Sequence, residues 1–381
     1  MGRLALDARA RRNLGAAALA WFGVLAGAIT AWFVFQPIRH DALDSDLTLV
    51  LVGIRIGLDH GWTHIYSLDL QRQAFEQLRP GALFGSGERF LSPPPLVWLA
   101  LPLSLLGGAA AFYVWTAASL AALAAAWWLA APGAGPRRWL WLIGALAWYP
   151  LQYGLSLGQP VLLVLLVAIA SWKLAEAGRP LLAGLVLGLA TIKPQLTLVL
   201  PAVLLAAGHW RLAAAWALTA GVLAAASLIA VGGQGAADYR SLLGDAQLVA
   251  NNRYFTLAYF VGPGALSYAA QAAVILAGLA GAYMNRGAGL ARLFALGLVA
   301  SASSATYWHL QDYTMLVAAA WLFWRGDPPR WQRWWLLVVV VGGELAWPLR
   351  PLPVLIGLAV WLACLAVPRR PQARTRALAP A

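Results

Sequence analysis

The sequence predicts an all-α protein that crosses a membrane many times. Of its 381 residues, 61% are hydrophobic and 11% are charged, a composition outside the usual range of soluble globular proteins. The hydrophobic residues form long apolar runs, and short connectors rich in arginine separate these runs. A hydrocarbon core about 30 Å thick takes about 20 residues of apolar helix, so the runs are expected to be membrane helices. We expect a single integral membrane domain over residues 1–381.

The first expected element is a membrane-spanning helix over residues 14–36. Arg3, Arg9, Arg11 and Arg12 precede it. A secretory signal peptide has the same order, but its apolar region has roughly 7 to 15 residues and ends at a small-residue cleavage site. This run is longer and ends in AWFVFQP. We therefore expect a retained helix that enters the membrane from the cytoplasmic side.

A long polar loop over residues 37–95 comes next, and we expect it to be folded and functional. It holds seven of the fourteen acidic residues of the chain. Connectors of this length are usually functional or disordered, and this one is too rich in Leu, Ile, Phe and Trp for disorder. Residues 95–107 are short and bracketed by prolines and glycines, so they are expected to form a juxtamembrane element on the outer side.

The remaining apolar runs and the charges between them set the expected topology. The further spans are expected at residues 109–131, 138–154, 159–175, 180–192, 194–208, 211–231, 264–284, 289–304, 308–324, 332–348 and 352–367. Short loops rich in Lys and Arg stay in the cytoplasm, which places both termini and the basic tail at 368–381 inside. About twelve spans result, with a second long extracytoplasmic loop at 232–262.

Isolated polar residues gather on the expected outer face. Besides those of the first loop they are Gln159, Lys193, the NNRYF stretch at 251–255 with Arg253, His309, Asp312 and Glu344. Ionisable groups at a membrane are costly and point to function by default. Each also has a structural explanation: a lysine can extend to the interface, a glutamine can link two helices, and an aspartate can complement a helix dipole.

The first loop carries two further ambiguous patterns. Asp44 or Asp46 could simply cap the helix predicted for LTLVLVGIRIGL. His60 and His64 have the i, i+4 spacing of metal ligands, but Gly61 between them argues against a helix, and a third ligand is not evident. We expect no metal site.

The net charge of +13 does not indicate a nucleic-acid partner. The basic residues are spread in short clusters between apolar runs, as in the cytoplasmic loops of membrane proteins. The single cysteine, Cys364, lies in an apolar run, so the chain has neither a disulfide framework nor a cysteine metal site. The expected partner of the surface is the lipid bilayer.

Several polar motifs, taken in order, carry a family resemblance. After an early extracytoplasmic Asp they are GWTHIYSL, FLSPPPLVWLALPL, SLGQPVLLVLL, GLVLGLATIKPQLTLVLP and ASSATYWHLQDYTML. With this order the chain resembles GT87, a family of polyprenyl-phosphate-dependent mannosyltransferases in the GT-C superfamily, over about residues 14–325. Two positions depart from the family pattern: Val161 stands where Asn is typical after GQ, and Ser92 stands where Tyr is common before Pro-Pro.

The resemblance implies a GT-C-like fold and a glycosyltransferase of the plasma (inner) membrane that serves the cell envelope. The enzyme would move a sugar, mannose in that family, from a polyprenyl phosphate to a hydroxyl of a lipid or glycan acceptor. The transfer would be an inverting single displacement at the extracytoplasmic face, without a cofactor. GT-C enzymes use an Asp of the first loop as the base, and its place falls on Asp46, with Asp44 as the second choice.

Sugar transfer from a lipid phosphate requires a base and groups that stabilise negative charge, and the expected outer face carries residues of both kinds. A sugar hydroxyl is a poor nucleophile, so a carboxylate must take its proton. The departing phosphate develops negative charge, which cations or hydrogen-bond donors must stabilise. The candidates for this second task are Lys193, Arg253, His309 and Arg55. Gln159 and Asp312 are expected beside them in the same substrate site.

Two other functions compete with the enzyme. A transporter or flippase for a lipid-linked substrate is the alternative, but such proteins are usually built from internal repeats, and their polar residues divide between the two faces. A polysaccharide polymerase or ligase would share an outer-face site but should carry its main polar loop late in the chain. This chain carries it first.

The isoprenoid tail of a lipid donor would need access from the bilayer. Short helices interrupted by Pro and Gly around residues 95–107 and 180–208 predict a lateral opening there. Bulky substitutions at Gly184 or Gly188 should then impair use of the donor without unfolding the protein.

Overall fold

The computed structural model describes residues 8–346 and 350–368, and within these ranges every regular element is a helix. The α-helices are α1 (Ala8–Val34), α2 (Gln36–His40), α3 (Leu47–Asp59), α4 (Leu68–Leu78), α5 (Pro94–Ala100), α6 (Gly108–Ala130), α7 (Arg137–Ala147), α8 (Tyr149–Ser156), α9 (Val161–Glu176), α10 (Pro180–Gly188), α11 (Leu200–Ala206), α12 (Trp210–Leu248), α13 (Ala258–Val261), α14 (Ala265–Met284), α15 (Leu290–Ser304), α16 (Met315–Arg325), α17 (Arg330–Glu344) and α18 (Leu352–Ala366). The 3₁₀ turns are η1 (Trp62–His64), η2 (Leu101–Leu105), η3 (Leu189–Ile192), η4 (Pro194–Leu196), η5 (Ala250–Arg253) and η6 (Leu310–Thr314). Arg3 and the basic tail from residue 369 onward lie outside the described residues.

Membrane helices are present, as the composition predicts. Among the described residues, three helices are long and apolar enough to cross a bilayer: α6, α12 and α14. The pair α8 and α9, bent by 119° at a short break, would make a fourth span if counted as one. Large apolar side chains such as Trp21 (74% exposed) and Ile229 (82% exposed) face outward, as they do on a lipid-facing surface. The count of twelve spans stays a prediction.

Several expected spans are interrupted helices. Residues 138–154 divide into α7 and α8, and residues 180–208 divide into α10, η3, η4 and α11. Prolines stand at these breaks. A proline fits the first turn of a helix, because its φ is fixed and its missing N–H needs no partner there, but it interrupts a helix that precedes it. The expected juxtamembrane segment at 95–107 is likewise two short pieces, α5 and η2.

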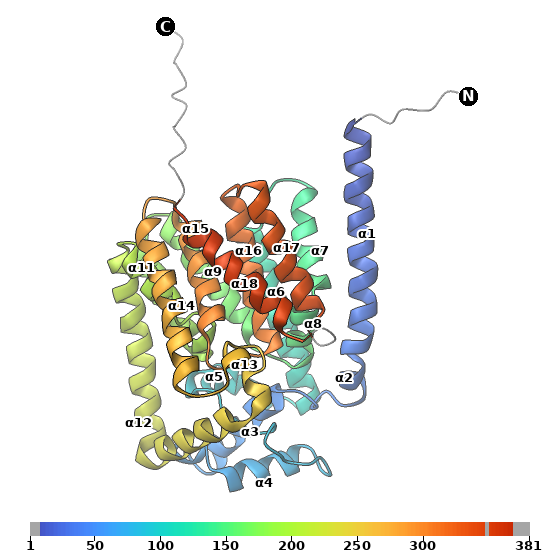
Figure 1. Cartoon of the computed structure of the whole chain (residues 1–381). Coiled ribbons are helices and arrows are strands. Elements are labelled where there is room, and N and C mark those ends of the chain that lie inside the picture. The colour runs from blue at the N-terminus through green and yellow to red at the C-terminus, as the bar shows by residue number, and fades with distance from the viewer. Residues whose placement is uncertain (1–7, 347–349, 369–381) are drawn as a thin grey trace, which may run out of the picture.

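The long helix α12 passes through a kink. At Gly232 the backbone has φ 62° and ψ −170°, a conformation open essentially to glycine alone. The helix then continues to Leu248, so most of the stretch expected as the second outer loop is helical. In Figure 1, α12 reaches the end of the molecule where α3 and α4 lie, away from the start of α1.

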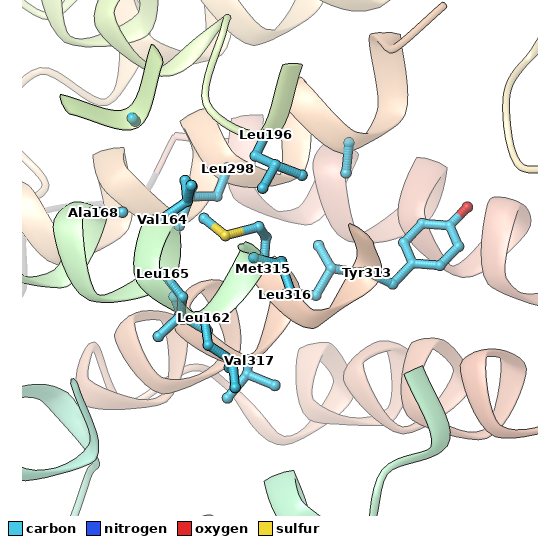
Figure 2. Packing of buried hydrophobic residues seen from close by; sticks show 14 of the residues in the cluster. Leu162, Val164, Leu165, Ala168, Leu196, Leu298, Tyr313, Met315, Leu316 and Val317 are labelled. Atoms are coloured by element: carbon cyan, nitrogen blue, oxygen red, sulfur yellow. The ribbon is translucent and has the colours of Figure 1, made fainter. Parts of the chain in front are cut away.

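The centre of the bundle is formed by helices that are buried on all sides. Every residue of α15 from Arg292 to Ser304 is buried, and α16 is buried from Met315 to Phe323. Figure 2 shows Leu162 and Leu165 of α9 packed with Met315 and Leu316 of α16. Close packing of this kind holds side chains in fixed positions. The core therefore gives a rigid base to the segments that lead into α9 and α16.

The glycines of α10 are packing contacts, which corrects one expectation. A Cβ added at Gly184 would lie 2.2 Å from the carbonyl oxygen of Leu212, and one at Gly188 would lie 2.4 Å from Cβ of Thr219. Both neighbours belong to α12, so larger side chains would force α10 and α12 apart. The expectation that bulky residues here leave the fold intact is wrong, because these positions seal a helix contact and do not line an opening.

Candidate active site

A cavity of about 740 Å³ lies where six separate segments meet. They are the start of α3, the stretch 86–96, the stretch 153–160, residues 193–195, the far half of α12 with the residues up to 255, and the stretch 306–311. The first loop and late parts of the chain thus share one chamber. Its wall includes Asp46, Gln159, Lys193 and His309.

The turn before α3 is held in place by an arginine that directly follows α4. Arg79 pairs with Asp41 and with Asp44, each at 2.9 Å. Asp41 Oδ1 also accepts a hydrogen bond from the backbone N–H of Leu43 at 2.8 Å. Thr48 Oγ1 donates to the carbonyl of Leu43 at 2.6 Å, which ties the turn to the first residues of α3. The backbone on both sides of Asp46 is therefore fixed.

Asp46 stands at the N-cap of α3, but its side chain does not cap the helix. Its Oδ2 instead accepts a hydrogen bond from Nε2 of Gln159. The next residue, Leu47, is buried, and its N–H donates to the carbonyl of Leu157 at 3.2 Å. Asp46 is thus joined to the segment before α9 by both its side chain and the adjacent backbone.

A glycine is required where these two segments touch. Gly158 has φ 65°, in the left-handed region that favours glycine, and a Cβ there would lie 2.8 Å from Cβ of Leu47. Its carbonyl accepts a hydrogen bond from Nε1 of Trp115 at 2.8 Å. The close approach places Gln159 beside Asp46.

Lys193 fixes the orientation of the Gln159 amide. Lys193 Nζ donates to Gln159 Oε1 at 2.6 Å. A lysine can only donate, so the amide must turn its oxygen to Lys193 and its NH₂ group to Asp46. Asp46 Oδ2 is therefore an acceptor in this arrangement.

The lysine itself is anchored by a buried carboxylate. Lys193 Nζ pairs with Oδ1 of Asp312, whose side chain is fully buried, while the lysine side chain is 13% exposed. Asp312 Oδ2 accepts from the backbone N–H of His309 at 3.2 Å. A buried charge of this kind persists only when it is paired and hydrogen-bonded, as here. The other lysine of the chain, Lys173, is exposed in the last turn of α9.

His309 is held in its neutral form. Nδ2 of Asn252 donates to the carbonyl of Ala246 at 2.9 Å, so its Oδ1 faces His309 and accepts from Nε2–H at 3.0 Å. Nδ1 of His309 then faces the amide of Gln311 at 3.4 Å. Burial lowers the pKa of His309. The negative charge of Asp312 raises this pKa, and the positive charge of Lys193 lowers it. Both ring nitrogens of His309 are therefore engaged, and the ring brings no positive charge to the site.

The pKa of Asp46 is raised. Burial is the main cause, and the negative charge of Asp312 acts in the same direction. The hydrogen bond from Gln159 and the charge of Lys193 act in the opposite direction. A carboxylate with a raised pKa is a stronger base than an ordinary aspartate, which suits a group that removes a proton.

Three of the expected site residues lie away from the cavity. Asp44, whose side chain is 53% exposed, is taken by Arg79. Arg55 faces outward on α3 and forms an i, i+4 pair with Asp59 at 3.6 Å. Arg253 is half-buried in η5 and does not belong to the cavity wall. The structure therefore brings together Asp46, Gln159, Lys193, His309 and Asp312 and leaves these three outside.

Among the wall residues that were not predicted as site residues are Arg89, Tyr307 and Asn252. Asn252 is the neighbour of an expected residue, and the 3₁₀ turn η5 decides which of the two faces the cavity. Tyr307 and Arg89 carry no spacing signal that sets them apart in the sequence. Within residues 8–346 and 350–368, three or more His, Cys, Asp or Glu side chains do not come together in a group that could hold a metal ion.

The chain was also compared with known proteins. A family model described as Glycosyltransferase family 87 matches residues 90–348, more than half of the chain. No curated protein and no solved structure matches. The matched range contains Gln159, Lys193 and Asp312, while Asp46 lies before it.

Proposed function

The chain belongs to glycosyltransferase family 87, and from that premise we propose that it transfers a sugar from a polyprenyl phosphate to an acceptor hydroxyl. The family shows a glycosyltransferase, and the helices show a membrane protein. The resemblance of the motifs favours mannose as the sugar, and a lipid or glycan of the cell envelope as the acceptor. The observation that carries the proposal is Asp46, oriented at the wall of the cavity by Gln159 and Lys193.

The proposed reaction is one inverting displacement. The acceptor oxygen forms a bond to the anomeric carbon as the bond from that carbon to the phosphate oxygen breaks. The hydroxyl proton passes to Asp46, and the electron pair of the broken bond leaves with the polyprenyl phosphate. Atoms and charges balance without a further reactant.

The residues behind Asp46 are proposed to position it. Gln159 holds Oδ2, and Lys193 and Asp312 hold Gln159. Because this chain of contacts rests on the buried core around α9 and α16, Asp46 stays in one orientation as the substrate binds. His309 and Asn252 add polar groups to the same wall, which suit the hydroxyls of a sugar.

The cavity is proposed to open on the extracytoplasmic side of the plasma membrane. In Figure 1, α1 begins and α18 ends on the side of the molecule away from α3 and α4. Arg325 and Arg330 flank the connector between α16 and α17, and the connector between α14 and α15 carries Arg286. Arginine-rich short loops favour the cytoplasm, which supports an outward orientation of the first loop.

The test is sugar transfer by the purified full chain in lipid, with polyprenyl-phosphate-mannose and candidate acceptors. Asp46→Asn should lose roughly 10²- to 10⁴-fold in turnover, the usual contribution of a general base. Asp44→Asn is the matched control, because this carboxylate lies outside the cavity in a partly exposed ion pair, and its turnover should stay near wild type. Equal turnover in wild type and Asp46→Asn would refute the assignment.

A further inference from the structure

The cations expected from the sequence are poorly placed to meet a departing phosphate. Lys193 already forms an ion pair with Asp312 and donates a hydrogen bond to the Gln159 amide. His309 is neutral, and Arg55 and Arg253 do not belong to the cavity wall. A leaving phosphate in a partly enclosed site still needs positive charge nearby.

Arg89 lies on the cavity wall in a segment that is firmly held. Gln71, fully buried in α4, accepts from the N–H of Phe90 at 2.9 Å and donates to its carbonyl at 3.3 Å. The hydroxyl of Tyr66 donates to the carbonyl of Ser92 at 2.9 Å. The backbone that carries Arg89 is therefore pinned on its C-terminal side to residues of the folded first loop.

The guanidinium of Arg89 has hydrogen-bonding capacity to spare. One of its nitrogens pairs with Oδ2 of Asp245 at 2.8 Å. Its Nε, although buried, has no hydrogen-bond partner among the described residues. A guanidinium offers five N–H donors in a planar fork that matches phosphate oxygens. The group is charged, sits at the cavity and is only partly satisfied.

Asp245 is a partner that the arginine can give up. It lies on α12 beyond the kink at Gly232, and its side chain is 52% exposed, whereas that of Arg89 is 23% exposed. Separated from Arg89, an exposed carboxylate recovers its hydration at little cost. The guanidinium of Arg89 is less exposed, so without Asp245 it would be a poorly hydrated cation that attracts another anion.

We propose that Arg89 binds the phosphate of the lipid-linked donor and that Asp245 occupies its place until the donor arrives. This inference rests on the proposed function, because it assigns the phosphate of that same donor. Segment 86–96 and the far half of α12 form different parts of the cavity wall, and the Arg89–Asp245 pair joins them directly. Donor binding exchanges one anion for another at Arg89, so Asp245 competes with the donor.

The test compares two variants that break the same ion pair from opposite sides. Binding of a polyprenyl phosphate without sugar and of the matching polyprenol without phosphate is measured on the full chain in lipid, together with KM for the sugar donor. Arg89→Gln should weaken binding of the polyprenyl phosphate by roughly 10- to 100-fold, while binding of the polyprenol stays unchanged. Asp245→Asn should leave binding of the phosphate unchanged or strengthen it, because the competing carboxylate is gone.

The controls separate this role from a structural one. Arg72→Gln removes an exposed cation of α4 that is not on the cavity wall, and it should change none of these values. If Arg89→Gln fails to fold, Arg89→Lys keeps the charge without the planar fork and should give an intermediate loss.

The outcomes are distinct. Similar weakening in Arg89→Gln and Asp245→Asn, or normal phosphate binding in folded Arg89→Gln, would overturn the inference and leave the proposed function standing. A wild-type chain that binds the polyprenyl phosphate no better than the polyprenol would overturn both. Opposite effects of the two variants on the phosphate ligand alone would support the exchange.

Discussion

At the scale of single residues, two aspartates of the same short motif have different surroundings. Asp44 pairs with Arg79, the residue after α4, whereas Asp46 accepts a hydrogen bond from Gln159 at the cavity. The sequence could single out both acids, because they interrupt an apolar chain. It could not choose between them, since the side chains that separate their roles come from distant segments.

The raised pKa of Asp46 predicts how activity depends on pH. The proposed base works only when ionised, so activity should fall as the pH drops through the pKa of Asp46. Because burial raises that pKa, the loss should begin at a higher pH than for an ordinary aspartate. Gln159→Leu removes the hydrogen bond that lowers the pKa, so the acid limb of kcat/KM should move to still higher pH. Gln77→Leu, an exposed position of α4, should leave the limb in place.

Acid unfolding would not explain that limb. A carboxyl with a raised pKa in the folded state favours folding more as the pH falls, so Asp46 itself adds stability where activity is lost. Circular dichroism across the same pH range checks this point. An acid limb at the same pH in wild type and Gln159→Leu would contradict the role of the hydrogen bond.

Replacing Gly158 should lower turnover as well as stability. Gly158→Ala places a residue with Cβ at φ 65° and drives that Cβ into Leu47, next to Asp46. We expect lower turnover together with a stability loss above the ~1 kcal/mol of backbone strain alone. Gly135→Ala has a similar φ of 59° with open space around it, so it should show the strain without the loss of turnover. Turnover and thermal unfolding of both variants provide the measurement.

At the scale of elements, the sequence located the apolar segments but not their interruptions. Helix periodicity marks where residues can be buried, whereas a break depends on which backbone groups find partners after packing. The helix at 211–231 was expected to end before Gly232, yet it bends there and continues to Leu248. This continuation supplies Tyr239 to the cavity wall and Asp245 to the pair with Arg89, neither of which hydropathy could place.

The contact between α10 and α12 gives a prediction for helix packing. Gly184→Leu and Gly188→Val should each lower the thermal unfolding temperature markedly, because their side chains meet the backbone of Leu212 and the side chain of Thr219. Gly221→Ala on α12 has open space around it and should be neutral or slightly stabilising, since alanine favours a helix. A folded, fully stable Gly184→Leu variant would show that the two helices can separate without cost.

At the scale of the whole molecule, the site exists only after the chain has folded. Asp46, Gln159, Lys193 and Asp312 come from four separate parts of the sequence and form one chain of contacts, of which the first three line the cavity. They could be proposed from sequence because polar groups are rare among membrane helices and because the motifs resemble one family. Arg89 escaped this reasoning, because an arginine in a polar loop is not unusual until the cavity is known.

The expected orientation can be tested on a background without reactive thiols. Cys364, the only cysteine of the chain, is buried and can be replaced by alanine. Leu83→Cys, at a position that is 90% exposed in the first loop, should react from outside the cell with a membrane-impermeant maleimide. Gly287→Cys, in the connector between α14 and α15, should react only after the membrane is permeabilised. The reverse pattern would place the cavity in the cytoplasm.

The scarcity of lysine in this molecule has a practical use. Lys193 is engaged by Asp312 and nearly enclosed, whereas Lys173 is exposed near the end of α9, and α9 begins just after Gln159. From Val161 to Lys173 the helix rises about 18 Å, so Lys173 stands well away from the chamber. Among side chains, amine-reactive dyes and coupling resins will therefore attach at Lys173, which allows the enzyme to be immobilised or tracked one molecule at a time with its chamber unobstructed.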